Sequence, residues 1–388
     1  MQPNGAMNRR TAIIVVAAVM VLGLAILSRS RQTAVAPTPA RADPPAPRSQ
    51  FKPRLPAPRL ATAAPVAEPQ PDDPPATNLI ARLLNGDDSF KLSSQQVETC
   101  LQANRRSAEG LLAAFRTTED PAFLWEAMEK YPNDPRVNFA ACFAAMRLPE
   151  LPPEERRQRL EAFKQSAPDN ALANYLSAQH DFQSGQTDQA VQELVAAFNK
   201  SKFRDYSGDF VQNIEEAYRA AGYSEGEAKA AAAYALPLPQ LAELRRLGQN
   251  LGELANLYRQ AGDESSAQSA LQMGLTLGQR VAEPSGQNYL IHDLVGLAIE
   301  RQILERMDPA SPYDSAGHTV QDRLSELAQR REVIRELQGA VDPSGKWDSL
   351  AGVLQTLSEQ DLISFFDRVK VSGELEAMRW VRSRQAKP

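Results

Sequence analysis

The sequence holds few of the residue types that carry out chemistry. Its three histidines are His180, His292 and His318, and two of them precede an aspartate, Asp181 and Asp293. Adjacent residues on a helix point about 100° apart, so neither pair forms a ready general-base dyad. The sequence contains no motif typical of a zinc protease, a serine hydrolase, a phosphate-binding loop or a dinucleotide-binding loop. These residues therefore predict no catalytic site.

The cysteines and carboxylates do not predict a metal site either. Cys100 and Cys142 lie far apart, without the Cys/Cys or Cys/His spacing of a zinc site. Two small buried side chains are the favoured interpretation, and a disulfide is the alternative if the chain is exported. In the segment 298–307, Glu300 and Glu305 stand beside arginines, which predicts a solvated helix face. We expect no cofactor, no metal and no small-molecule substrate.

The charge balance excludes another class of partner. The chain carries 43 basic and 48 acidic residues, a net charge of −5, and an estimated pI of 5.5. These charges are spread evenly, so there is no basic stripe that could release counterions from a nucleic acid. Nucleic acid is therefore not an expected partner.

The N-terminus predicts a membrane anchor. Residues 1–10 form a short basic tail, and residues 11–28 form an uncharged apolar run with arginines on both sides. At about 1.5 Å per residue this run makes a helix of about 27 Å, enough for a bilayer core. A cleaved signal peptide is the alternative, but small residues suited to cleavage do not follow the run directly. We expect an uncleaved transmembrane helix.

Residues 29–76 predict a disordered linker. Of the 28 prolines in the chain, 13 lie between Pro37 and Pro75, where large apolar residues are scarce. Prolines at this density block helix and sheet pairing, and in a polyproline conformation the linker would reach roughly 140 Å. More arginines follow the apolar run than precede it, which favours a cytoplasmic body. The tiny N-terminal tail and the proline-rich linker favour a body outside the cytoplasm, and we expect the periplasmic side.

From residue 77 onward the pattern is that of an all-α protein. Ala, Leu, Gln, Glu and Arg are abundant, and aromatic residues are few. Helix-start signals are explicit at Ser93 or Ser94, at Pro121 and at Ser358, and Pro132 ends a helix. No stretch shows the alternation or the β-branched enrichment of a strand.

Turn glycines recur along this body. Gly185, Gly222 and Gly262 stand at intervals of 222 − 185 = 37 and 262 − 222 = 40 residues, which indicates stacked helical hairpins. Around Gly262, small residues stand where two helices would touch, at Ala255 and Ala267. The glycine can take the left-handed conformation that ends the first helix. Gly274 would then admit the next hairpin.

At these residues the sequence resembles the tetratricopeptide repeat family, which pairs two antiparallel helices per unit. The matching positions are Leu251, Leu254, Ala255, Tyr258, Gly262, Ala267, Leu271 and Gly274 in one unit, and Ala178, Gly185, Ala190, Leu194 and Ala197 in another. Around Gly222 the small residue of the return helix, Ala228, comes one position late. The resemblance implies an α-solenoid over residues 77–286, followed by a diverged or capping region over 287–388.

The resemblance also implies where a partner would bind. In such stacks the first helices of the units line a concave groove, and their exposed side chains recognise a protein or peptide. The candidate groove residues are Tyr175, Gln179, Phe182, Arg219, Asn256 and Arg259. Tyr175 and Phe182, seven positions apart, could equally belong to the core.

Together these observations predict a membrane-tethered, non-catalytic helical-repeat scaffold that binds a protein or peptide in the bacterial cell envelope. Two alternatives remain: a helical accessory domain or enzyme that acts on an envelope polymer, and a structural spacer that fixes a distance from the membrane. Neither alternative has a specific residue pattern to support it.

Overall fold

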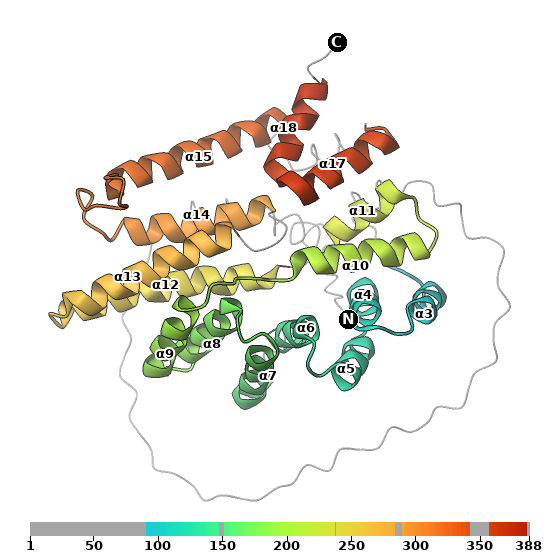
Figure 1. Ribbon diagram of the computed structural model, residues 1–388, viewed down its shortest axis with the longest axis horizontal. Helices are drawn as coiled ribbons and strands as arrows, with labels where there is room; N and C mark the ends of the chain where they lie inside the picture. The colour runs from blue at the N-terminus through green and yellow to red at the C-terminus, as the bar shows by residue number, and fades with distance from the viewer. Residues whose placement is uncertain (1–90, 147–150, 237, 284–288, 342–356, 386–388) are drawn as a thin grey trace, which may run out of the picture.

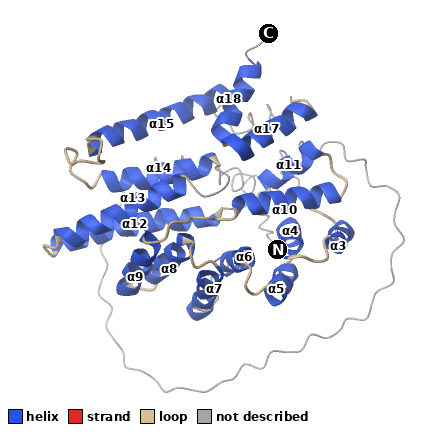
Figure 2. Cartoon of the chain, in the orientation of Figure 1, coloured by secondary structure: helices blue, strands red, loops and turns tan. Residues whose placement is uncertain are grey.

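The computed structural model describes residues 91–146, 151–236, 238–283, 289–341 and 357–385, and every regular element in these ranges is an α-helix (Figure 2). The prediction of an all-α body is thus confirmed there. The predicted tail, membrane helix (11–28) and linker (29–76) lie outside the described residues. Within the described ranges, no helix combines the length and the apolar character that a membrane crossing requires.

The helices fall into three groups along the chain (Figure 1). The first group comprises α3 (Ser94–Ala103), α4 (Ala108–Thr118), α5 (Pro121–Lys130), α6 (Pro135–Met146), α7 (Pro153–Ser166), α8 (Ala171–Gln183) and α9 (Thr187–Phe198). The second comprises α10 (Ser207–Ala220), α11 (Glu225–Tyr234), α12 (Pro239–Gln260), α13 (Glu264–Ala282) and α14 (Leu290–Leu304). The third comprises α15 (Val320–Val341), α17 (Glu359–Ser372) and α18 (Glu374–Gln385).

The predicted helix starts and turns are present. Ser93 caps α3 in a capping box with Gln96, and the hydroxyl of Ser358 accepts a hydrogen bond from the Asp361 amide at the start of α17. Gly185 and Gly262 have φ values of 71° and 80°, in the left-handed region that glycine tolerates best. The two glycines therefore lie at the turns between α8 and α9 and between α12 and α13.

The first group forms a row of stacked helices. From α4 to α9 each helix packs on the next along the chain, and Figure 1 shows these helices nearly end-on, one beside another. Stacked hairpins bury a continuous core in this way, because each pair covers the apolar face of its neighbour.

The second group does not extend this row. Instead, α10 packs against α3 and α4, and α12 packs against α8, so that these helices run across the row (Figure 1). Aromatic side chains fill the junction: Phe139 of α6 lies 5.5 Å from Tyr206 and 6.0 Å from Phe210, measured between ring centroids. The chain thus covers one side of its own row with a second layer.

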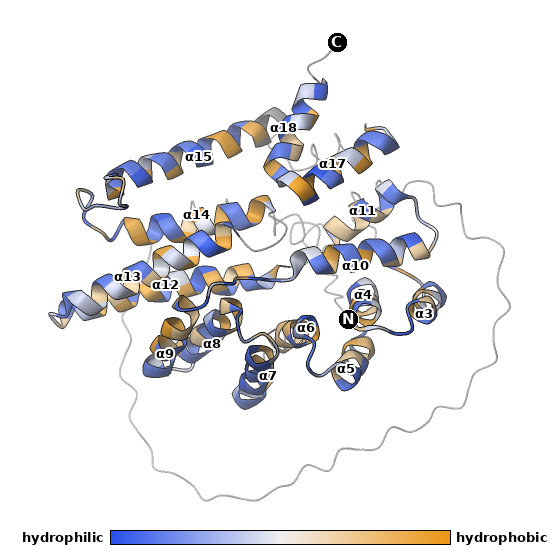
Figure 3. Cartoon of the chain, in the orientation of Figure 1, coloured by the Kyte–Doolittle hydropathy of each residue, from blue (hydrophilic) through white to orange (hydrophobic). Residues whose placement is uncertain are grey.

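Glycines allow α13 and α14 to pack closely against each other. A Cβ atom placed on Gly274 would lie 2.6 Å from Cδ1 of Ile303, and one placed on Gly296 would lie 2.5 Å from the carbonyl oxygen of Gly278. Gly274 thus lets α14 pack closely on α13, and its place in a stack of repeated hairpins stays a prediction. By contrast, α15 is largely hydrophilic in Figure 3, with apolar residues only at intervals, and it buries the narrow stripe of Val320, Leu327, Ile334 and Leu337.

Candidate functional site

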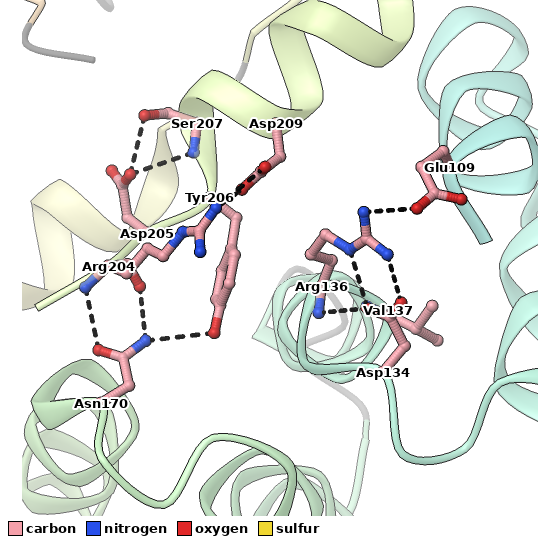
Figure 4. A network of polar contacts seen from close by, with 10 residues as sticks. All are labelled: Glu109, Asp134, Arg136, Val137, Asn170, Arg204, Asp205, Tyr206, Ser207 and Asp209. Carbon is pink, nitrogen blue, oxygen red and sulfur yellow. Dashed lines mark hydrogen bonds and ion pairs between the residues drawn. The ribbon is translucent and has the colours of Figure 1, made fainter. Parts of the chain in front are cut away.

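The most concentrated buried polar cluster surrounds Asp205, in the segment between α9 and α10. The Asp205 side chain is only 4% exposed. Its Oδ1 atom accepts hydrogen bonds from the backbone amide (3.1 Å) and hydroxyl (2.8 Å) of Ser207 (Figure 4). Its Oδ2 atom lies 3.0 Å from Nε2 of Gln240 on α12 and 2.8 Å from Nε2 of His292 on α14. One carboxylate therefore joins α10, α12 and α14.

Hydrogen bonds also join the segment that carries Asp205 to the start of α8 in the row. Asn170, the N-cap of α8, donates from Nδ2 to the carbonyl of Arg204 (2.7 Å) and accepts from the Arg204 amide (3.0 Å) (Figure 4). The amide of Ala171 donates to the carbonyl of Lys202 at 2.8 Å. These bonds fix the segment at the junction of the two layers, and Tyr206 follows it with a φ of 57°.

Figure 4 shows a second fastening beside the first, within the row. The Arg136 guanidinium at the start of α6 pairs with Asp134 (2.6 Å) and with Glu109 of α4 (2.7 Å). Burial opposes ionisation of both carboxylates, but hydrogen bonds outweigh it and lower the pKa of each: those from Arg136 for Asp134, and those from its own backbone amide and Arg136 for Glu109. This arginine thus links two hairpins of the row.

Burial and pairing act in opposite directions on the carboxylates around His292. Burial alone would raise the pKa of Asp205, but the hydrogen bonds from His292 and Ser207 outweigh it and hold that pKa below its usual range. Glu374, at the start of α18, is half-buried, and burial of its carboxylate raises its pKa because the hydrogen bond from the Leu290 amide only partly compensates. The cluster therefore contains one carboxylate stabilised in its charged form and one destabilised in it.

A histidine beside an aspartate is the arrangement of many general bases, but here it is sealed. His292 is 0% exposed, and its Nδ1 atom has no hydrogen-bond partner among the residues that the structure describes. A cavity of about 410 Å³ between α15 and α18, and another of about 230 Å³ among α3, α4 and α10, are lined by other residues. The contact between Asp205 and His292 therefore lies in the interior, where it joins helices.

No sequence pattern indicates this pair, since the two residues stand 87 positions apart. The adjacent Asp293 is not predicted to pair with His292, and its carboxylate binds Arg330 of α15 at 2.8 Å. Within the described ranges, no three His, Cys, Asp or Glu side chains come together in a way that could hold a metal ion. Cys100 and Cys142 are both buried and not joined in a disulfide.

Two of the predicted groove residues lie in the interior. Tyr175 is 1% exposed and its hydroxyl accepts a hydrogen bond from Arg280 (2.9 Å). Gln179 is 4% exposed and accepts from Asn250 of α12 (2.9 Å). Tyr175 thus belongs to the core, the alternative given for it above, and the prediction that Gln179 faces a groove is wrong, because α12 lies across this side of α8. Phe182 is half-buried at the edge of the main core.

The other three predicted residues remain at least partly exposed. Arg219 is exposed in the last turn of α10, and Asn256 is exposed near the end of α12. Arg259, also on α12, is half-buried and donates to the carbonyl of Arg306 (2.8 Å). The C-terminal ends of α10 and α12 point to opposite sides of the molecule (Figure 1). Arg219 is therefore not brought together with the other two.

An exposed leucine that the sequence analysis missed lies between Asn256 and Arg259. Leu257 is 60% exposed. We name Asn256, Leu257 and Arg259 the α12 tip surface. The signal is present in the sequence, because Leu257 falls outside the helical spacing (i, i+3, i+7) that places Leu251, Leu254 and Tyr258 on one face.

The prediction of a solvated face in the segment 298–307 is wrong for Glu300. This carboxylate is buried, and it accepts hydrogen bonds from Arg323 of α15 (2.7 and 2.9 Å) and from the hydroxyl of Tyr313 (2.8 Å). The helical pattern of α14 could not show that α15 would cover this face. Glu305 does lie on the surface, paired with Arg301.

Comparison with known proteins adds no relative to this description. The chain matches no family model, and no curated protein or solved structure matches it. The resemblance to tetratricopeptide repeats thus stays a prediction from the residues quoted above.

Proposed function

We propose that the chain is a membrane-tethered, non-catalytic helical scaffold that binds a protein or peptide partner in the bacterial cell envelope. The proposal rests on one contrast among the described residues. The side chains best suited to chemistry, Asp205 and His292, are sealed inside the fold, whereas a large apolar side chain, Leu257, is held in solvent. Residues 11–28 supply the membrane tether, and the periplasmic side is the proposed location of the body.

The α12 tip surface is the proposed contact with the partner. Leu257 supplies exposed apolar area, and Asn256 and Arg259, which share a neighbouring face of α12 three positions apart, supply hydrogen-bond donors, a combination common in protein interfaces. Arg259 is partly immobilised by the carbonyl of Arg306, so that less side-chain entropy is lost when a partner binds.

Co-purification from gently solubilised membranes tests this function. The full chain should recover a specific partner, and Leu257→Ser should lose it, because the substitution removes the apolar contact. Trp125→Ser on α5 is the matched control, since Trp125 is also a large exposed apolar residue, at 65% exposure, but lies in the row. Equal recovery by the wild type and by Leu257→Ser would exclude the α12 tip surface, and absence of any specific partner would count against the scaffold itself.

The location has its own test. A reporter that is active only outside the cytoplasm, fused after Pro388, should be active. An inactive reporter, with a cytoplasmic reporter active at the same position, would overturn the proposed orientation and leave partner binding to be judged separately.

A further inference from the structure

The C-terminal helices α17 and α18 pack around an apolar cluster of their own. This cluster is separate from the main core, and its buried members are Leu362, Phe365, Phe366, Val369, Ala377 and Val381. We call α17 and α18 the C-terminal hairpin. The hairpin adds a single buried residue, Met378, to the main core. Most of the apolar surface of the C-terminal hairpin is therefore buried within the hairpin and against the residues around its edge.

Charged side chains make much of the contact between this hairpin and the body. Nζ of Lys229, on α11, lies 2.7 Å from Asp367 of α17 and 3.2 Å from Glu215 of α10. Lys370 of α17 also pairs with Glu215. Lys229 and Glu215 are buried, so a chain of alternating charges crosses the boundary between α17 and the pair α10/α11.

Two further carboxylates of the hairpin lie at the first turns of body helices. Oε1 of Glu359 accepts a hydrogen bond from the amide of Gly226 (2.8 Å), at the start of α11. Oε2 of Glu374 accepts from the amide of Leu290 (3.0 Å), at the start of α14. Free amides at helix starts favour a carboxylate, but burial raises the pKa of Glu374 and so weakens this contact in its charged form.

We propose that the C-terminal hairpin is a displaceable cap, which releases from the body as a unit while the row and the second layer stay folded. Buried ion pairs contribute little net stability, because their charges regain water when they separate. The cap keeps its own apolar cluster when it leaves, and residues 342–356 keep it joined to α15. Its release uncovers Tyr289 and the Ala230 and Ala233 face of α11, which pack against the cluster when the cap is closed.

Hydrogen exchange on the full chain tests the cap. In the wild type, amides of α17 and α18 should exchange faster than those of α12 and α13, because partial opening is enough to expose them. Lys229→Met leaves Asp367 without this partner, and it should speed exchange in α17 and α18 by about tenfold or more with no change in α12 and α13. Lys202→Met is the matched control, because its ion pair with Asp169 is exposed, and it should change neither.

A second variant covers the case in which Lys229→Met fails to fold. Glu359→Gln keeps an acceptor for the Gly226 amide but removes the charge, and Glu359 lies at an exposed position. It should also speed exchange in α17 and α18 selectively. If exchange instead rises together in α12, α13, α17 and α18 for the variant that folds, the hairpin is an integral part of the body. If exchange in α17 and α18 stays at the wild-type rate, the charged contacts do not hold the cap. Either result would overturn the proposal.

Discussion

At the scale of single residues, the Asp205 side chain joins three helices. Its two oxygens reach α10, α12 and α14, and the backbone beside it is fastened to α8 through Asn170. Such a carboxylate resists substitution by an isosteric amide, because one oxygen then becomes a donor facing other donors. The stability of the junction should therefore depend on its charge.

Asp205→Asn is the direct test of this dependence. The new amide turns its NH2 group toward donors that Asp205 accepts from, and a buried polar group left without a partner costs about 1–3 kcal/mol, so we expect a decrease of at least that size in the free energy of unfolding, measured with urea. Asp169→Asn is the control, because Asp169 belongs to an exposed ion pair, and it should change stability by less than about 1 kcal/mol. Equal effects of the two substitutions would show that the Asp205 contacts are not stabilising.

Glu374 should affect stability in the opposite way as the pH changes. Its pKa is raised in the folded state, so the folded chain holds this proton more tightly, and stability falls as the pH rises from the unfolded pKa through the folded pKa. For Asp205, whose folded pKa is lowered, stability is present above the unfolded pKa and is lost as the pH falls through the folded pKa.

Glu374→Gln should therefore unfold at a higher urea concentration than the wild type at pH 7, because it removes a buried charge and keeps an acceptor for the Leu290 amide. The difference should shrink on acidification, as Glu374 becomes protonated in the wild type. Urea unfolding at several pH values measures this, and a gain that persists unchanged into acid would contradict the assigned cause.

At the scale of helices, the local signals predicted the turns and caps but not the way the layers cross. Ser93 and Gly262 act through their own backbone neighbours, so the sequence around them is sufficient. Tyr175 is bonded by Arg280 of α13, Gln179 by Asn250 of α12, and Glu300 by Arg323 of α15. Helical periodicity shows that a face is apolar or polar and does not show which distant helix will cover it.

Close packing of α13 on α14 gives a prediction at this scale. In an exposed helix, Gly→Ala stabilises by up to about 1 kcal/mol. At Gly274 the new Cβ would lie 2.6 Å from Ile303, and such overpacking costs about 1–3 kcal/mol. Gly274→Ala should therefore lower the thermal midpoint. The control Ser269→Ala, on the exposed side of α13, should leave it nearly unchanged, and an increased midpoint for Gly274→Ala would show that the two helices can move apart at little cost.

At the scale of the whole molecule, Arg280 of α13 ties the second layer to the end of the row. Its Nη1 donates to the carbonyl of Ala197 (2.8 Å), at the end of α9, and to the hydroxyl of Tyr175 (2.9 Å). Its Nη2 donates to the carbonyls of Phe198 (3.2 Å) and Lys200. A cation at this position also complements the negative end of the α9 dipole.

Arg280→Met removes these hydrogen bonds and the positive charge but retains much of the apolar side chain. It therefore separates their contribution to stability from that of packing. Hydrogen bonds to a charged group contribute about 1.5–3 kcal/mol, and we expect a loss of at least that size in urea unfolding, with faster hydrogen exchange at the end of α9. Arg335→Met, whose ion pair with Glu332 is exposed on α15, is the matched control. A loss no larger than that of the control would show that the layers are held by apolar packing alone.

The second layer also sets the order in which the chain can complete its fold during synthesis. Tyr175 and Gln179 emerge early, but Arg280, the partner of Tyr175, follows 105 residues later, and Asn250, the partner of Gln179, follows 71 residues later. A nascent chain that ends before α10 contains all the helices of the row, but the side of the row that the second layer covers is still exposed to solvent. That interval, and not the folded protein, is when the row is most exposed to aggregation and to chaperones.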